Sequence, residues 1–101
     1  MINAEKTLKT AVEIYGKEAQ TDMMIEEMSE LTKALLKHRR NPTAKTLDNI
    51  KEEMADVQIM LDQMRMIYGD NGGYRAEKLL RLASRLNIDE DTDAGGLMPA
   101  T

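Results

Sequence analysis

The chain has 101 residues, enough for one small domain with a modest core. It contains no cysteine, which excludes disulfide bonds and cysteine-ligated zinc sites. Its formal net charge is −4, from 18 acidic and 14 basic residues, and it has neither Trp nor Phe, so we expect no nucleic-acid partner.

The amino-terminal segment is charged and amphipathic, and it lacks the apolar stretch of a secretion signal. No apolar run in the chain approaches the roughly 20 residues that a bilayer-spanning helix requires. We therefore expect a cytoplasmic protein with no membrane association.

Apolar residues recur at intervals of three and four along most of the chain, as they do in helices. The first helix is expected over about residues 4–17, with Asn3 as its N-cap. The second is expected to begin after Thr21, read as an N-cap, and to end before Asn41 and Pro42.

The third helix is expected over about residues 43–68, where a glycine-rich turn ends it, and the fourth over about 74–86. Short connections between helices favour antiparallel neighbours. The predicted fold class is therefore all-α, a four-helix bundle formed by a single domain at residues 1–87. Residues 88–101 are polar and glycine-rich, and are predicted to be a flexible carboxy-terminal tail.

Carboxylates cluster in the two central helices at unusual positions. They are Glu26, Glu27 and Glu30 in the second helix and Glu52, Glu53 and Asp56 in the third. Residues three or four apart share a helix face, so Glu27 projects with Glu30, and Glu53 with Asp56. Glu27 falls at the edge of its apolar stripe and Glu53 falls within one. Like charges at this spacing destabilise a helix, and burial of unpaired carboxylates costs more still.

A bound divalent cation is the simplest way to offset this repulsion. A cage of oxygen atoms suits the hard ions Mg²⁺ or Mn²⁺. Because Mg²⁺ usually takes phosphate oxygens into its coordination shell, the pattern predicts a phosphorylated ligand. The alternative is an ordinary charged face, in which the carboxylates pair with Lys33, Lys37 and Lys51.

The carboxylate pattern also resembles a known family. Glu26-Glu27-Met28-Ser29-Glu30, followed by Glu53-Met54-Ala55-Asp56, is similar to the EExxE…ExxD signature of the MazG-like nucleotide pyrophosphohydrolases. The likeness covers about residues 15–86. It includes the flanking apolar residues of both central helices and the segment KLLRLASRL near the end.

This resemblance implies an all-α enzyme that cleaves the α–β phosphate bond of (deoxy)nucleoside triphosphates, giving the monophosphate and pyrophosphate. The metal ligands that it implies are Glu27, Glu30, Glu53 and Asp56. Glu26 would support a ligand or activate water. Several relatives carry an aromatic residue one turn after the last aspartate, where this chain has Met60, so base recognition stays open.

Two sets of basic residues are candidates for phosphate binding. They are Lys33 and Lys37 on the second helix, and Lys78, Arg81 and Arg85 on one face of the fourth. The alternative for the fourth helix is a solvated face or an ion pair with Glu77. His38, the only histidine, is read as part of a basic helix end and not as a ligand.

These observations predict a Mg²⁺-dependent hydrolase in which a bound water is the nucleophile and carboxylates do the chemistry. Two alternatives remain: a helical protein-interaction module with a Met-rich face, and a nucleotide-binding regulator with negligible turnover. Ile25, Leu36 and Ile59 lie off the inward stripes, and exposed apolar residues of this kind mark interfaces. They predict a homodimer or homotetramer.

Overall fold

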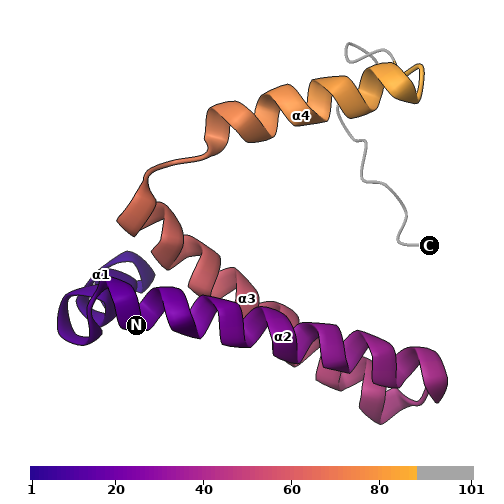
Figure 1. Ribbon diagram of the computed structural model, residues 1–101, viewed down its shortest axis with the longest axis horizontal. Coiled ribbons are helices and arrows are strands. Elements are labelled where there is room, and N and C mark those ends of the chain that lie inside the picture. Colours follow the sequence, from indigo (N-terminus) through magenta and orange to yellow (C-terminus); the bar gives the residue numbers. More distant parts are fainter. Residues whose placement is uncertain (89–101) are drawn as a thin grey trace. The chain divides into compact units, whose positions relative to one another are not determined.

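The computed structural model describes residues 1–88, and over this range it contains four helices and no strand. They are α1 (Ala4–Tyr15), α2 (Lys17–Arg40), α3 (Ala44–Tyr68) and α4 (Gly72–Arg85) (Figure 1). The all-α prediction is confirmed for these residues, whereas the packing of all four helices into one bundle stays a prediction. The predicted tail lies outside the described residues, apart from Ile88.

Two helices begin at side chains that satisfy free backbone donors. Asn3 caps α1, because its Oδ1 accepts a hydrogen bond from the backbone N–H of Lys6 at 3.0 Å. At α3, Thr43 Oγ1 accepts from the backbone N–H of Thr46, and Thr46 Oγ1 accepts from that of Thr43, at 3.1 and 2.9 Å. The Asn3 cap and the third helix were therefore correctly predicted.

The expected start of the second helix was wrong. Gly16, with φ of +93°, separates α1 from α2, and α2 starts directly after it. Thr21 lies inside α2, where its hydroxyl donates to the carbonyl of Lys17 at 2.8 Å and also contacts the Tyr68 hydroxyl at 2.7 Å. A threonine can serve as an N-cap or bond back to its own helix, and sequence alone did not distinguish the two.

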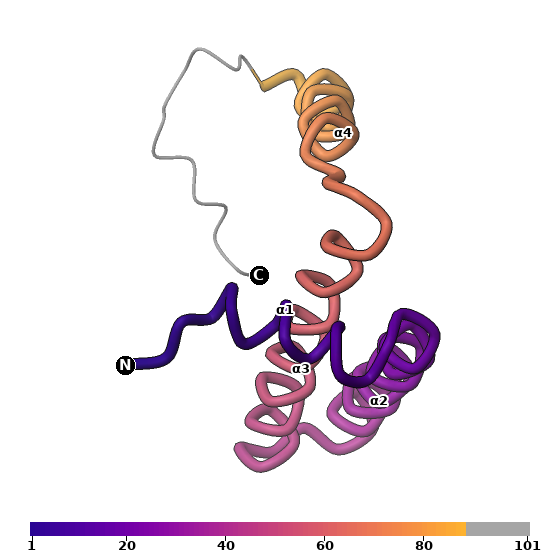
Figure 2. Tube along the Cα trace, turned by 90° about the vertical axis from the view of Figure 1, so that its left-hand side faces the viewer, coloured from indigo at the N-terminus to yellow at the C-terminus, as the bar shows by residue number. Residues whose placement is uncertain are grey.

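Helices α2 and α3 form an antiparallel hairpin whose shared seam is the centre of the fold (Figures 1 and 2). The buried apolar residues of the described chain are Ala34, Ile50 and Met60, and all three lie in this hairpin. Helix α1 packs against both partners at the end where α2 begins and α3 finishes. The core is small, so each seam position matters to stability.

Part of the seam is polar. Gln20 in α2 and Gln63 in α3 are both buried, and Gln20 Nε2 donates to Gln63 Oε1 at 2.7 Å. A buried amide pair is satisfied only when the two helices are in one register, so this bond specifies how α2 and α3 align. Gln20 therefore has a structural role, joining the first part of α2 to the last part of α3.

The chain divides into two compact units, and α4 belongs to the second, which begins at Asp70. Gly69, with φ of +109°, ends α3 at the boundary. No residue of α4 is buried, and Leu79, Leu82 and Leu86 along its apolar stripe are about half exposed. Among the described residues, no helix has both the length and the apolar character needed to cross a membrane.

The buried amide pair generates a stability prediction. Gln63→Ala should lower the free energy of unfolding by about 1–3 kcal/mol, because it leaves the Gln20 amide buried without its partner. Urea unfolding followed by circular dichroism measures the loss, and Gln58→Ala on the exposed side of α3 is the matched control. The double variant Gln20→Met with Gln63→Met should lose much less unfolding free energy than the sum of the losses in Gln20→Met alone and Gln63→Met alone. Strict additivity would show that the two amides do not act as a pair.

Candidate metal centre

Three carboxylates converge across the hairpin seam. Glu27 comes from α2, and Glu53 and Asp56 come from consecutive turns of α3. One carboxylate oxygen from each lies within 4.8 Å of the other two. Glu27 and Glu53 are partly buried at the seam, whereas Asp56 is exposed. The fold therefore brings together side chains that are 26 or more positions apart in sequence.

The geometry fits a small divalent cation. An octahedral Mg²⁺ with oxygen ligands at about 2.1 Å has opposite ligands about 4.2 Å apart. Separations within 4.8 Å thus need only small side-chain rotations to become ligand distances. The donors are all carboxylate oxygens, the type that Mg²⁺ and Mn²⁺ prefer, and exposed Asp56 leaves an open side for water or a ligand.

The electrostatics of the cluster favour a cation as well. Burial raises the pKa of the Glu27 carboxyl first, and the charges of Asp56, Glu53, Glu26 and Glu30 raise it further. Within residues 1–88, no Lys, Arg or His forms an ion pair with Glu27, Glu53 or Asp56. The three carboxylates therefore repel one another, and no described basic side chain lies within ion-pair distance of them.

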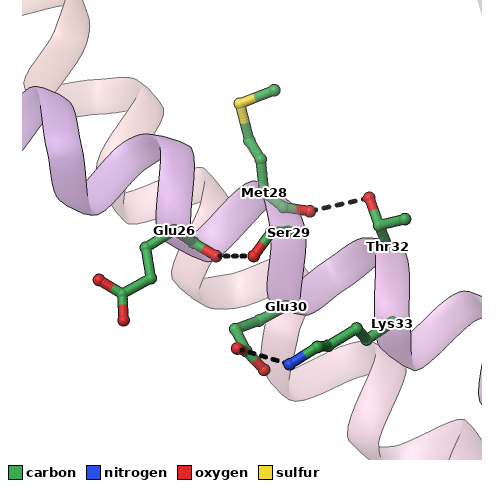
Figure 3. Close-up of polar contacts among 6 residues, drawn as sticks. All are labelled: Glu26, Met28, Ser29, Glu30, Thr32 and Lys33. Carbon is green, nitrogen blue, oxygen red and sulfur yellow. Dashed lines mark hydrogen bonds and ion pairs between the residues drawn. The ribbon is translucent and has the colours of Figure 1, made fainter.

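The remaining acidic candidates lie beside the cluster. Glu30 is partly buried, but its Oε1 lies 3.4 Å from Lys33 Nζ, and the two side chains face each other in Figure 3. Glu26 is exposed and its side chain extends away from Glu30 (Figure 3). Thus three of the four predicted ligands come together. The Glu30 carboxylate would join them only if its contact with Lys33 Nζ were broken.

Two hydroxyl groups in the same stretch of α2 bond to the backbone of their own helix. Ser29 Oγ donates to the carbonyl of Glu26 at 2.9 Å, and Thr32 Oγ1 donates to the carbonyl of Met28 at 3.0 Å (Figure 3). Neither hydroxyl is therefore bonded to a base that could activate it. His38 lies further along α2 and contacts Thr46 Oγ1 at 2.7 Å, a structural contact between the helices.

The two predicted basic sets have different positions. Lys33 and Lys37 line a hollow of about 460 Å³ on the hairpin, whose wall also includes Glu30 and Glu53. Lys78, Arg81 and Arg85 lie on α4 in the second unit, where Arg81 Nη2 is 3.4 Å from Glu77 Oε1. The predicted alternative of an ion pair with Glu77 is therefore seen for Arg81.

Sequence reasoning missed other residues of the hairpin. Arg40, Lys45 and Asn49 line hollows on the same side as Lys37. Arg40 ends α2 and Lys45 belongs to the first turn of α3, so the short connection between the two helices places both beside the same hollow. The only available signal was a run of basic residues around Asn41 and Pro42, which also suits a helix terminus.

No protein-family model, no curated protein and no solved structure matches this chain. The geometry of the carboxylate cluster therefore stands as the main evidence for a site.

The raised pKa of Glu27 generates a prediction about metal and pH. A carboxyl with a raised pKa in the folded state destabilises the fold as pH rises from its ordinary pKa through the raised one. In EDTA, the melting temperature of wild type should therefore fall relative to that of Glu27→Gln as pH rises from about 4 to neutrality. At pH 7, millimolar Mg²⁺ should raise the wild-type melting temperature, since an ion that binds only the folded state stabilises it.

Glu27→Gln should respond to Mg²⁺ far less than wild type, whereas the matched variant Glu18→Gln, on an exposed part of α2 away from the cluster, should respond fully. Differential scanning fluorimetry measures all three proteins. Identical wild-type melting curves in EDTA and in Mg²⁺ would exclude a metal site here.

Proposed function

We propose that this chain is a Mg²⁺-dependent nucleoside triphosphate pyrophosphohydrolase that cleaves the α–β phosphate bond. The observation that carries the proposal is the meeting of Glu27, Glu53 and Asp56 at a partly buried seam without basic partners. Their spacing within the EExxE…ExxD pattern supports the same conclusion. The proposed products are a nucleoside monophosphate and pyrophosphate, and the proposed role is removal of nucleotides from a cytoplasmic pool.

The proposed site combines carboxylates with distinct tasks. Glu27, Glu53 and Asp56 would hold the ion, with Glu30 as a fourth ligand once a phosphate draws Lys33 away from it. When bound, Mg²⁺ or Mn²⁺ supplies charge neutralisation for phosphate oxygens and lowers the pKa of a water. Glu26, exposed beside the cluster, is the candidate to accept the proton that water loses as it attacks phosphorus.

The reaction adds water across the anhydride bond. The water oxygen forms a new bond to the α-phosphorus, the bridging P–O bond breaks, and pyrophosphate leaves with the electron pair. Negative charge grows on the leaving group, and cationic side chains stabilise such charge. Lys33 and Lys37, next to Glu30 and Glu53 in the hollow, are placed for this task. Lys78, Arg81 and Arg85 are proposed as a second phosphate-binding set.

We further propose that the working unit is a homodimer or homotetramer. Ile25, Leu36 and Ile59 are 62, 47 and 47 % exposed, as expected of interface residues. A second apolar row is formed by Leu47, Met54 and Leu61, spaced by seven residues along α3 and also nearly half exposed. This heptad spacing suits packing against another helical hairpin, and two-fold self-association covers such rows on both copies at once.

The apolar row and the carboxylates occupy different sides of the hairpin. In Figure 3, Met28 extends from α2 on the side opposite to Glu30. By helical geometry, Leu47 and Met54 flank the seam on the Met28 side, whereas Asp56 flanks it on the Glu30 side. Association through the apolar side would therefore leave the proposed metal centre open to substrate.

The proposed function predicts which carboxylates are essential. Glu53→Gln and Asp56→Asn should each lower Mg²⁺-dependent pyrophosphate release by about 100-fold or more, because each removes a charged metal ligand. Glu18→Gln, an exposed residue of α2 outside both the cluster and the hollows, should change the rate less than about threefold. The measurement is pyrophosphate release from a panel of nucleoside triphosphates, with circular dichroism to verify that each variant is folded.

Full activity in both Glu53→Gln and Asp56→Asn would remove these residues from the site. Metal-dependent nucleotide binding without pyrophosphate release would instead identify a nucleotide-binding regulator. Neither binding nor turnover, with the apolar side engaged by another helix, would identify an interaction module.

Self-association predicts a mass well above that of one chain. Sedimentation velocity at micromolar concentration should give a dimer or tetramer of the 11.4 kDa chain. Replacing Met54 and Leu61 by Glu should shift the distribution toward monomer, because it puts charge into the apolar row. Wild-type protein that is active and sediments as a monomer would contradict the proposal.

A further inference from the structure

Two hollows join into one groove along the carboxylate side of the hairpin. The smaller, of about 460 Å³, has Glu30 and Glu53 at its acidic end and Lys37, Arg40 and Asn49 further along. The larger, of about 870 Å³, shares these last three residues and continues to the turn between α2 and α3. The groove therefore leads from the proposed metal centre to the closed end of the hairpin.

The far part of this groove carries cations that the fold leaves unpaired. Lys37, Arg40 and Lys45 are exposed, and none forms an ion pair with another described residue. Lys33, nearer the carboxylates, is held by Glu30. Basic residues in the last turn of α2 are explained by the helix dipole, which favours positive charge there.

The helix dipole does not explain Lys45. It lies in the first turn of α3, where the dipole favours negative charge, and that turn contains no acidic residue. Its side chain lines the larger hollow together with Arg40. An anion in the hollow would be attracted both by these two side chains and by the amino-terminal end of α3.

We infer that this groove binds the terminal phosphates of a polyphosphate ligand whose inner phosphates lie at the carboxylate cluster. The inference rests on the proposed function and deepens it by assigning Arg40, Lys45 and Asn49 to binding. Asn49 lies one turn before Glu53 on α3, about 6 Å along the helix axis, and Lys45 lies one turn further. A triphosphate chain is long enough to span the first of these steps.

The charge of the larger hollow sets a second expectation. Asp48 and Glu52 also line it, opposing the three cations Lys37, Arg40 and Lys45. The excess positive charge is therefore small, so binding depends on individual cations. Removing one of these carboxylates should strengthen anion binding, since Coulomb repulsion of the ligand falls. The groove thus predicts opposite effects from basic and acidic substitutions in the same wall.

The test is binding of inorganic tripolyphosphate to the full chain at saturating Mg²⁺, measured by isothermal titration calorimetry. The double variant Arg40→Ala with Lys45→Ala should bind about tenfold more weakly or worse, because charge-assisted hydrogen bonds are lost. The matched control is Arg39→Ala with Lys51→Ala, which removes the same charges from the same two helices outside both hollows. It should change affinity less than about threefold, and Asp48→Asn should increase it.

Equal losses in the groove variant and its control would show a general charge effect and overturn the inference, as would unchanged affinity in both or no binding by wild type. Pyrophosphate release from nucleotides is measured separately on the same proteins. Groove-dependent tripolyphosphate binding without any nucleotide hydrolysis would retain the groove and remove the hydrolase. If Arg40→Ala with Lys45→Ala leaves both hydrolysis and tripolyphosphate affinity unchanged, the proposed hydrolase stands and the proposed phosphate groove is wrong.

Discussion

Repulsion among carboxylates at a helix–helix seam is the constraint around which this hairpin is built. Antiparallel helices gain most stability by filling their seam with apolar side chains, yet α2 and α3 place Glu27 and Glu53 there and Asp56 at the edge. Burial and neighbouring charge both raise the pKa of Glu27, so the arrangement costs stability at neutral pH. A cation bound between the three carboxylates would offset their mutual repulsion, because each would then contact a positive ion. For this reason the cluster supports the proposal of a metal-dependent function.

Polar contacts elsewhere in the seam fix the alignment of α2 against α3. On one side of the carboxylates, the buried Gln20–Gln63 hydrogen bond joins the start of α2 to the end of α3. On the other side, His38 contacts Thr46 at 2.7 Å near the closed end of the hairpin. These polar contacts are satisfied only in one alignment, and that alignment is the one that brings the carboxylates together. Register and site geometry are therefore determined by the same interactions.

The hairpin also separates its two surfaces. The side that carries Glu30 and Asp56 has the groove and its cations, whereas the side that carries Met28 and Met54 is apolar. With only three apolar residues buried among those described, the hairpin has little core of its own, and small cores usually gain stability from oligomerisation or a bound metal. The proposed self-association and the proposed metal would each supply part of what the isolated hairpin lacks.

The sequence by itself determined the helical class, every helix end except the start of α2 to within two residues, and the carboxylates that are candidates for a cation, because periodicity and spacing act locally along a helix. It did not determine the start of α2, since Thr21 had two local hydrogen-bonding options. Only the tertiary structure brought Glu27 of α2 together with Glu53 and Asp56 of α3, and only it joined Arg40 and Lys45 into one groove with Asn49. The physical reason is that these relations depend on the rotation and register of one helix against another, which no local pattern encodes.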